Sequence, residues 1–142
     1  MIYYLSLGAN IGAREQTLQS ALRQIEEQVG RVLRCSSFYY SAPWGFASEH
    51  EFCNMCCAVE TDLTPLRMLK ATQSIERQLG RRHKTEDGQY SDRTIDIDII
   101  RVFDKDGKEK SFNFQLSTFN LIIPHPLWHE RDFVKIPLAE IV

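Results

Sequence analysis

The chain has no strong charge of either sign. Its 142 residues carry 17 Lys and Arg against 19 Asp and Glu, which gives a net charge of −2. No overall field therefore attracts it to nucleic acid or to a membrane surface. Its longest apolar runs are too short to span a bilayer, and residues 1–15 lack the basic start and long apolar core of a secretory signal. We expect a cytoplasmic protein with no nucleic-acid or membrane partner.

The spacing of the four cysteines indicates neither a zinc site nor a disulfide framework. Cys53 and Cys56 form a C-x-x-C that Cys57 follows directly, but no second Cys or His pair follows at zinc-finger spacing. A strand over residues 52–59 would place Cys53 and Cys57 on one face and Cys56 on the other. We therefore interpret these thiols as small buried side chains in a reducing compartment.

Glycine-rich phosphate loops are missing as well. There is no G-x-x-x-x-G-K-[ST] motif, and the GANIG of residues 8–12 falls short of G-x-G-x-x-G. Phosphates would have to be held by side chains and metal. Repeats, low-complexity tracts and internal linkers are also absent, and the fractions of 43% hydrophobic and 25% charged residues are those of an ordinary globular protein. We expect one domain over residues 1–142.

The order of predicted elements indicates the fold class. Strands are expected at residues 2–7, 31–40, 52–63 and from 94 to about 103, and helices at residues 14–29 and from Pro65 to Gly80, the second capped by Thr64. This β-α-β-β-α-β order is typical of a ferredoxin-like α+β fold, an antiparallel sheet with helices packed on it. A hairpin turn at 104–107, a β-prone segment at 112–116 and a short C-terminal extension from residue 124 would follow.

The last core strand contains an acidic pair. In the stretch RTIDIDII, residues 93–100, strand alternation puts Ile95, Ile97 and Ile99 on one face and Asp96 and Asp98 on the other, with the aspartate Cα atoms about 7 Å apart. The two carboxylates either face water or hold magnesium. Mg²⁺ prefers hard oxygen ligands and commonly joins one or two carboxylates to substrate phosphates.

Several arginines and histidines precede or follow this acidic pair in the sequence. Arg81 and His83 belong to a basic run, Arg93 directly precedes the acidic strand, and His125 and Arg131 follow it about thirty residues later. They are either an ordinary solvated surface with a structural histidine, or the donors that polyphosphate recognition needs, because Arg offers bidentate bonds to phosphate oxygens.

A second group of residues suggests a pocket for a flat ring. The loop SAPWG, residues 41–45, precedes a strand that begins near Phe52. Phe52 and Asn54 would share one face, which joins an aromatic ring to an amide that both donates and accepts hydrogen bonds. Phe133 could supply an opposite stacking face. Alternatively, Phe52 belongs to the core and Asn54 is a strand-end residue.

Taken together, these segments resemble the 6-hydroxymethyl-7,8-dihydropterin pyrophosphokinases of folate biosynthesis. The matching segments cover nearly the whole chain in order: SLGAN, SSFYYSAPWGF, FCNMCCAVET, QSIERQLGR, DRTIDIDII and IIPHPLWHERDFVKIPLAEI. The RTIDIDI strand followed by PHP and R-x-F is a specific combination.

The resemblance implies a role for each candidate residue. Asp96 and Asp98 would bind two Mg²⁺ ions, and Phe52 and Phe133 would enclose the pterin ring. The pterin edge would be read by Asn54 with groups of Ser41, Ala42 and Trp44. The positions that match the lining of the ATP site are Gln73, Glu76, Arg81, His83, Arg93, His125 and Arg131. Catalysis would rest on the two aspartates, Arg93 and His125.

We therefore expect a monomeric enzyme that transfers pyrophosphate from MgATP to the hydroxymethyl group of a reduced pterin and releases AMP. A polar loop over residues 82–92 is expected to close on bound phosphates. Two other classes remain open from the residues alone. One is a non-catalytic ferredoxin-like ligand-binding domain, which would bind MgATP without turnover. The other is a D-x-D nucleotidyltransferase, which usually has a Gly-Ser near its acidic strand.

Overall fold

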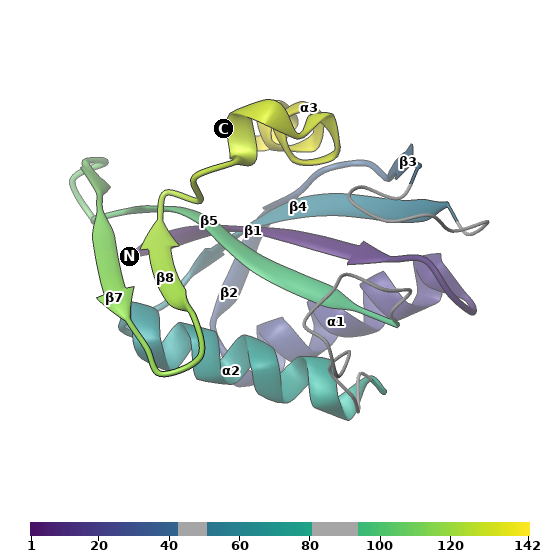
Figure 1. Ribbon diagram of the computed structural model, residues 1–142, viewed down its shortest axis with the longest axis horizontal. Coiled ribbons are helices and arrows are strands. Elements are labelled where there is room, and N and C mark those ends of the chain that lie inside the picture. Colours follow the sequence, from purple (N-terminus) through teal and green to yellow (C-terminus); the bar gives the residue numbers. More distant parts are fainter. Residues whose placement is uncertain (43–50, 81–93) are drawn as a thin grey trace.

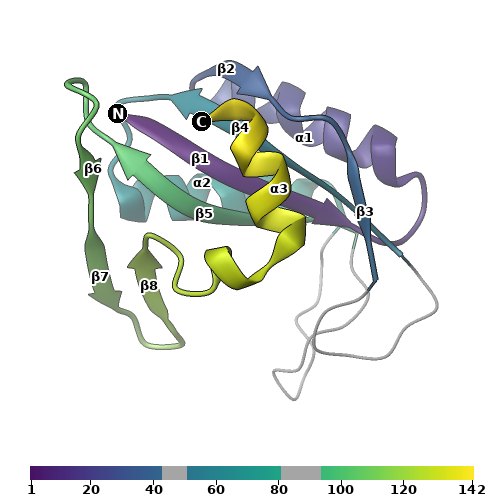
Figure 2. The same ribbon diagram turned by 90° about the horizontal axis from the view of Figure 1, so that it is seen from above.

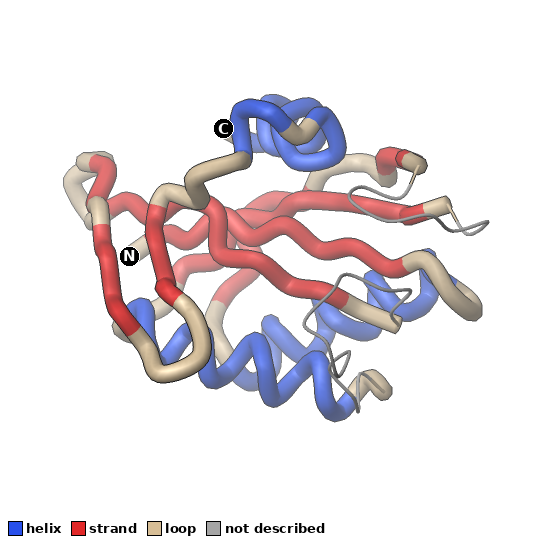
Figure 3. Tube along the Cα trace, viewed as in Figure 1, coloured by secondary structure: helices blue, strands red, loops and turns tan. Residues whose placement is uncertain are grey.

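The architecture is a six-stranded antiparallel sheet with helices on both faces, beside a two-stranded sheet (Figure 1). It is seen in a computed structural model that describes residues 1–42, 51–80 and 94–142. The first elements are β1 Ile2–Ala9, α1 Arg14–Gln28, β2 Arg31–Cys35, β3 Tyr39–Ser41, β4 Phe52–Glu60, α2 Pro65–Gln78 and β5 Asp96–Phe103. They are followed by β6 Glu109–Lys110, β7 Phe112–Gln115, β8 Asn120–Ile123, the 3₁₀ helix η1 Trp128–Glu130 and α3 Asp132–Ile141 (Figure 3).

The strand order confirms the predicted ferredoxin-like α+β fold. The main sheet runs β2-β4-β1-β5-β6, with β3 paired to the other end of β4. Every pairing within it is antiparallel. Because β1 lies between β4 and β5, the two βαβ halves interleave as the split βαβ layout requires. The strands β7 and β8 form a separate two-stranded sheet.

The two faces of the sheet carry different layers. The helices α1 and α2 cover one face, and α3 lies on the other (Figures 1 and 2). On the first face, α1 buries Leu18, Ala21 and Ile25. The second face packs its apolar residues against α3 in a smaller cluster: Tyr4, Cys56, Ala58, Ile100, Val134, Leu138 and Ile141. Asn54, Asp96 and Asp98, which are discussed below, lie on this second face.

The start of α2 is built as predicted, and its buried face includes polar residues. The side chain of Thr64 accepts a hydrogen bond from the backbone N–H of Arg67 at 3.4 Å, and Pro65 occupies the first turn. The residues buried against the sheet are Pro65, Met68, Thr72, Ile75 and Glu76. Leu66, Leu69 and Leu79 are partly buried and pack against the same core cluster as Ile75. The side of α2 that packs on the sheet therefore includes two polar residues, Thr72 and Glu76.

The cysteines behave as predicted. Cys53 and Cys57 lie in the core under α1 and α2, and Cys56 lies in the cluster under α3. All four thiols, including the exposed Cys35, are free.

Two segments differ from the sequence prediction. The expected strand over 31–40 is split, because Ser36 uses its hydroxyl to accept the backbone N–H of Cys56 at 2.9 Å, outside a regular ladder. The C-terminal extension contains a ten-residue helix with Pro137 inside it. Proline disfavours a helix interior, but burial of Val134, Leu138 and Ile141 on the sheet stabilises this one. The predicted loop over 82–92 lies outside the described residues, and no described helix is long and apolar enough to cross a membrane.

Candidate active site

The candidate site lies at the end of the sheet where β1 and β3 finish and β4 and β5 begin. In the ladder, Gly8 of β1 is the register partner of Asn54 on β4 and of Asp96 on β5. Two residues earlier, Ser6 is paired with Cys56 and with Asp98. Register partners in an antiparallel sheet have side chains on the same face. The amide of Asn54 and both carboxylates therefore share the face that carries α3.

The acidic pair keeps the predicted alternation. Asp96 and Asp98 are half-buried on β5, whereas Ile95, Ile97 and Ile99 are buried in the core on the opposite side. The alternation is interrupted just beyond the pair, because the register with β1 shifts and Ile100 becomes an extra residue. Ile100 joins the cluster under α3, on the aspartate face.

The backbone between the two aspartates is held from α2. Glu76 is 8% exposed, and its Oε2 accepts a hydrogen bond from the backbone N–H of Ile97 at 2.7 Å. Ile97 lies between Asp96 and Asp98, so this carboxylate fixes the strand segment from which both aspartates project. The sequence resemblance places Glu76 in the ATP site, and the structure adds this contact to β5.

Replacing Glu76 by alanine is expected to lower the free energy of unfolding by about 2 kcal/mol, because a buried hydrogen bond to a charged acceptor is lost and the N–H of Ile97 is left without it. Glu76→Gln keeps an acceptor oxygen and should lose less. Urea denaturation measures both changes. Glu27→Ala, at an exposed position of α1, is the control. An unfolding midpoint of Glu76→Ala equal to that of the control would show that the bond adds nothing.

Asn54 is buried, and its amide nitrogen makes two hydrogen bonds to β3. Its Nδ2 donates to the carbonyl oxygen of Tyr39 at 3.0 Å and to the hydroxyl of Ser41 at 2.8 Å. Its Oδ1 lies above Gly8, where an added Cβ would be 3.0 Å away. The predicted strand ended at residue 7, but Gly8 lies inside β1. A glycine within a strand often marks close approach of a ligand or another backbone, and this signal was overlooked.

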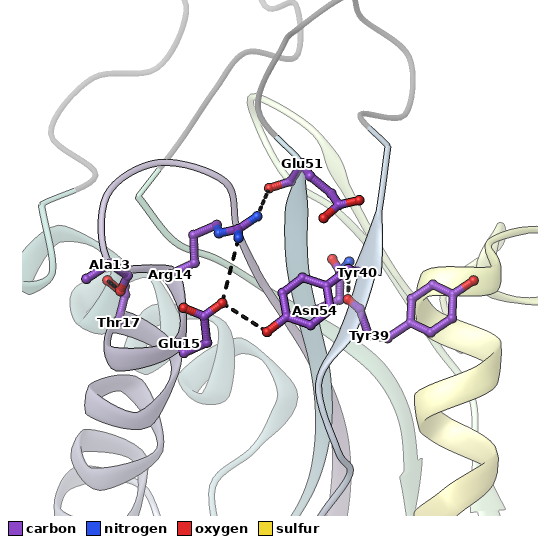
Figure 4. A network of polar contacts seen from close by, with 8 residues as sticks. All are labelled: Ala13, Arg14, Glu15, Thr17, Tyr39, Tyr40, Glu51 and Asn54. Carbon is purple, nitrogen blue, oxygen red and sulfur yellow. Dashed lines mark hydrogen bonds and ion pairs between the residues drawn. The ribbon is translucent and has the colours of Figure 1, made fainter.

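A polar network fixes the chain beside Asn54 (Figure 4). Arg14, the first residue of α1, donates from Nη1 to the carbonyl oxygen of Glu51 at 2.6 Å. The hydroxyl of Tyr40 donates to Glu15 at 3.0 Å, and the guanidinium of Arg14 lies 5.4 Å from the centre of the Tyr40 ring. These contacts hold Tyr40 and Glu51, the neighbours of Ser41 and Phe52, to α1. Phe52 itself is half-buried and is paired with Ser41 across β3 and β4.

The backbone of His125 is hydrogen-bonded to β5 at Ile100, the extra residue of that strand. Its backbone N–H donates to the carbonyl oxygen of Ile100 at 2.8 Å, and its Nδ1 accepts the backbone N–H of Leu127 at 3.2 Å. Burial and the charge of Arg131 lower the pKa of His125 to about 4, against an opposing effect of Asp96. Arg131 and Asp96 thus act on the charge of His125 in opposite directions. At neutral pH the imidazole is uncharged, and Nε2 carries its proton.

In the metal-free protein, His125 is therefore expected to titrate near pH 4 rather than at its ordinary value of 6.5. Between these values the unfolded chain binds more protons than the folded one. The stability that neutral His125 contributes is thus complete above about pH 6.5 and is lost as the pH falls to about 4. Proton NMR of the ring measures the titration. A His125 midpoint near pH 6.5 would contradict this expectation.

Of the remaining candidate residues, the structure describes four and leaves four outside its described part. Arg131 is buried just before α3, and its guanidinium carbon lies 5.9 Å from the ring centre of the half-buried Phe133. Gln73 is a half-buried residue of α2, on the face of the sheet opposite to the aspartates, and Ala42 is exposed at the end of β3. Four predicted residues lie outside the described part of the chain: Trp44, Arg81, His83 and Arg93.

Comparison with known proteins gives a consistent result. The family model described as "7,8-dihydro-6-hydroxymethylpterin-pyrophosphokinase (HPPK)" matches residues 4–142. The chain is 43% identical over 142 residues to a 2-amino-4-hydroxy-6-hydroxymethyldihydropteridine pyrophosphokinase of Porphyromonas gingivalis, with 99% of this chain and 90% of that protein covered. It is 38% identical over 141 residues to the protein of the same name from Bacillus subtilis, with 99% and 77% covered.

A solved structure supports the fold independently. An HPPK-DHPS crystallised in complex with substrates matches with a TM-score of 0.70 at 18% sequence identity. The match covers 99% of this chain and 40% of that one. At this identity, the likeness shows the shared fold.

Proposed function

Because the chain belongs to the 7,8-dihydro-6-hydroxymethylpterin-pyrophosphokinase family, it is an ATP-dependent enzyme that transfers pyrophosphate to hydroxymethyldihydropterin in folate biosynthesis, and we propose that Asp96 and Asp98 hold two Mg²⁺ ions for this reaction. Pyrophosphoryl transfer depends mainly on positioning and on charge stabilisation rather than on covalent work by the protein. The residues of the candidate site are assigned accordingly.

The two aspartates suit magnesium by their chemistry and their surroundings. Both are half-buried on one face of β5, and their register partners on β1 are the small residues Gly8 and Ser6, which leave room for ligands. Carboxylate oxygens are the hard ligands that Mg²⁺ prefers. The bound ions would neutralise phosphate charge and lower the pKa of the attacking hydroxyl. Glu76 keeps the intervening backbone in place through Ile97.

The pterin is assigned to the Asn54 side of the site. Its amide nitrogen is engaged with Tyr39 and Ser41, so Oδ1 is the atom aimed toward the Gly8 side, where it can accept from an N–H of the ring edge. Phe52 and Phe133 would enclose the ring, and Ser41, Ala42 and Trp44 would supply further edge contacts.

The phosphates are assigned to the His125 side. Neutral His125 can donate from Nε2, while Arg131 brings a permanent positive charge. Both can stabilise negative charge that develops on the transferred group or on the leaving AMP. Arg81, His83 and Arg93 would add donors, and Gln73 and Glu76 would line the nucleotide.

One observation carries this assignment: Gly8 is the register partner of both Asn54 and Asp96. This register puts the amide of Asn54 and the carboxylate of Asp96 on the same face, on the two strands that flank Gly8. The attacking hydroxymethyl group and the phosphorus it attacks would meet above Gly8.

Product analysis tests the reaction. If the pterin hydroxyl attacks the β-phosphorus of ATP, the α–β bridging oxygen leaves with AMP. We expect equal amounts of AMP and pterin diphosphate, measured by phosphorus NMR of a reaction with MgATP and the reduced hydroxymethylpterin. Stoichiometric ADP would mean single phosphoryl transfer, and free pyrophosphate would mean nucleotidyl transfer. No turnover with intact MgATP binding would fit a non-catalytic domain.

We also propose that residues 1–142 act as one pyrophosphokinase domain, as a monomer in the cytoplasm. The family match from residue 4 to residue 142 supports one domain, and four free thiols suit a reducing compartment. Sedimentation at working enzyme concentrations tests the monomer, and a stable dimer would contradict it.

A further inference from the structure

Two of the four cysteines face each other across neighbouring strands. Cys35, the last residue of β2, is the register partner of Cys57 on β4. The preceding pair, Arg34 and Ala58, belongs to the same ladder. The backbone N–H of Ser36 donates to the carbonyl oxygen of Cys56 at 2.8 Å. With a bond at 36–56, the register pair 35–57 is a non-hydrogen-bonded pair, the closer of the two antiparallel types.

This geometry suits a covalent link. The Cα atoms of a non-hydrogen-bonded pair are about 4.5 Å apart, within the range of about 4.4–6.8 Å that disulfides bridge. The side chains of such a pair point to the same face of the sheet. The other thiols fit less well, because Cys56 points to the opposite face of β4 and Cys53 lies roughly 13 Å along the strand from Cys57.

The residues around both thiols also indicate that the thiols lie on the face of the sheet that α1 covers. Cys57 is buried in the core beneath the helices. Burial and then the carboxylate of Glu26, a residue of α1, raise the pKa of Cys35, which places its thiol near that helix. Burial raises the pKa of Cys57 well above its ordinary value, with a further effect of Cys35.

The pair has an accessible member and a protected one. The strand β2 is at the edge of the sheet (Figure 2), and Cys35 is exposed, whereas Cys57 has no exposed surface. Cys35 can therefore meet a small molecule from solution, and its register partner Cys57 is shielded from it.

We propose that Cys35 and Cys57 are an oxidisable dithiol that forms a reversible cross-strand disulfide when it meets a small-molecule disulfide. The thiolate of Cys35 attacks one sulfur of the small disulfide, the S–S bond breaks, and one small thiolate leaves. The thiolate of Cys57 then attacks the sulfur of Cys35 and displaces the second small thiolate. The protein loses two electrons and two protons, and the small disulfide is reduced to two thiols.

The link would close the segment 35–57. That segment contains Tyr39, Ser41, Phe52 and Asn54, so the modification lies at the base of the chain segment assigned to the pterin. The proposal concerns the dithiol itself and does not depend on that assignment.

The experiment uses the full-length reduced protein under native conditions with oxidised glutathione as the probe. We expect intact-mass spectrometry to show loss of two hydrogen atoms with no retained glutathione, and peptide mapping to show a single link between residues 35 and 57. Dithiothreitol should restore the starting mass. A persistent glutathione adduct on Cys35, a dimer linked through Cys35, or a link to Cys53 or Cys56 would overturn the proposal.

Variants separate the roles of the two thiols. Cys35→Ser, at an exposed position, should abolish the reaction, and Cys57→Ala should stop it at a glutathione adduct on Cys35. Cys56→Ala is the matched control, because Cys56 is an equally buried neighbour on the other face of β4, and it should react like the wild type. Should Cys57→Ala fail to fold, the peptide map of the wild type and Cys35→Ser still decide the matter. Disulfide formation in Cys35→Ser would contradict the proposal.

Discussion

Replacing Asp98 by asparagine is expected to lower kcat about a thousandfold while leaving the protein folded. The change removes one charge from the proposed magnesium pair and preserves the shape of the side chain. Metal stabilisation of a phosphoryl-transfer transition state is worth several kcal/mol, and about 4 kcal/mol corresponds to about three orders of magnitude in rate. Asp96→Asn should behave similarly. Steady-state assays at saturating ATP and pterin, over a range of magnesium concentrations, measure the effect.

The fold should tolerate these changes. The two aspartates are half-buried on the same face of β5, and as like charges they repel each other without metal. The melting temperature of metal-free Asp98→Asn is therefore expected to equal or exceed that of the wild type. Asp106→Asn, in the exposed turn after β5, is the control and should keep full activity. Near-normal turnover in both Asp96→Asn and Asp98→Asn would rule out the metal assignment.

The second large effect is expected at Asn54. Asn54→Ala should raise the Kd of the reduced pterin about tenfold to a hundredfold, because a buried polar edge of the ring loses a partner at a cost of about 1–3 kcal/mol. The affinity for MgATP should not change. Calorimetric titration measures both ligands. Asn113→Ala, at an exposed position of β7, is the control.

Two companion variants identify the part of Asn54 that matters. Ser41→Ala removes one acceptor of Nδ2, while the bond to Tyr39 remains, so it should weaken the pterin less than Asn54→Ala does. Gly8→Ala would place a methyl group 3.0 Å from Oδ1, and the amide or the methyl must shift. It should weaken the pterin without loss of ATP binding. Unchanged pterin affinity in Asn54→Ala would return Asn54 to a structural role.

Local patterns in the sequence were sufficient for much of the fold. The period of the apolar residues predicted α1, and Thr64 with Pro65 predicted the start of α2, because capping and helix periodicity depend on residues only a few positions apart. Strand alternation likewise predicted the opposite faces of Cys56 and Cys57 and the shared face of the two aspartates. These features need no knowledge of what packs against them.

Where packing decides, the local patterns failed. They did not show α3 as one helix, since Pro137 disfavours it locally and only burial of Val134, Leu138 and Ile141 on the sheet favours it. They did not show that Ser36 divides β2 from β3, because this depends on the backbone of Cys56, twenty residues away.

For the site, the sequence by itself determined which chemical groups are present and which residues share a strand face: the carboxylates of Asp96 and Asp98, and the ring of Phe52 with the amide of Asn54. Only the tertiary structure decided that Gly8 lies between these two groups, that Glu76 holds the backbone of Ile97, and that burial beside Arg131 leaves His125 uncharged. The reason is physical: alternation along a strand is fixed by the backbone of that strand, whereas register, burial and electrostatic environment arise from contacts between segments far apart in the chain.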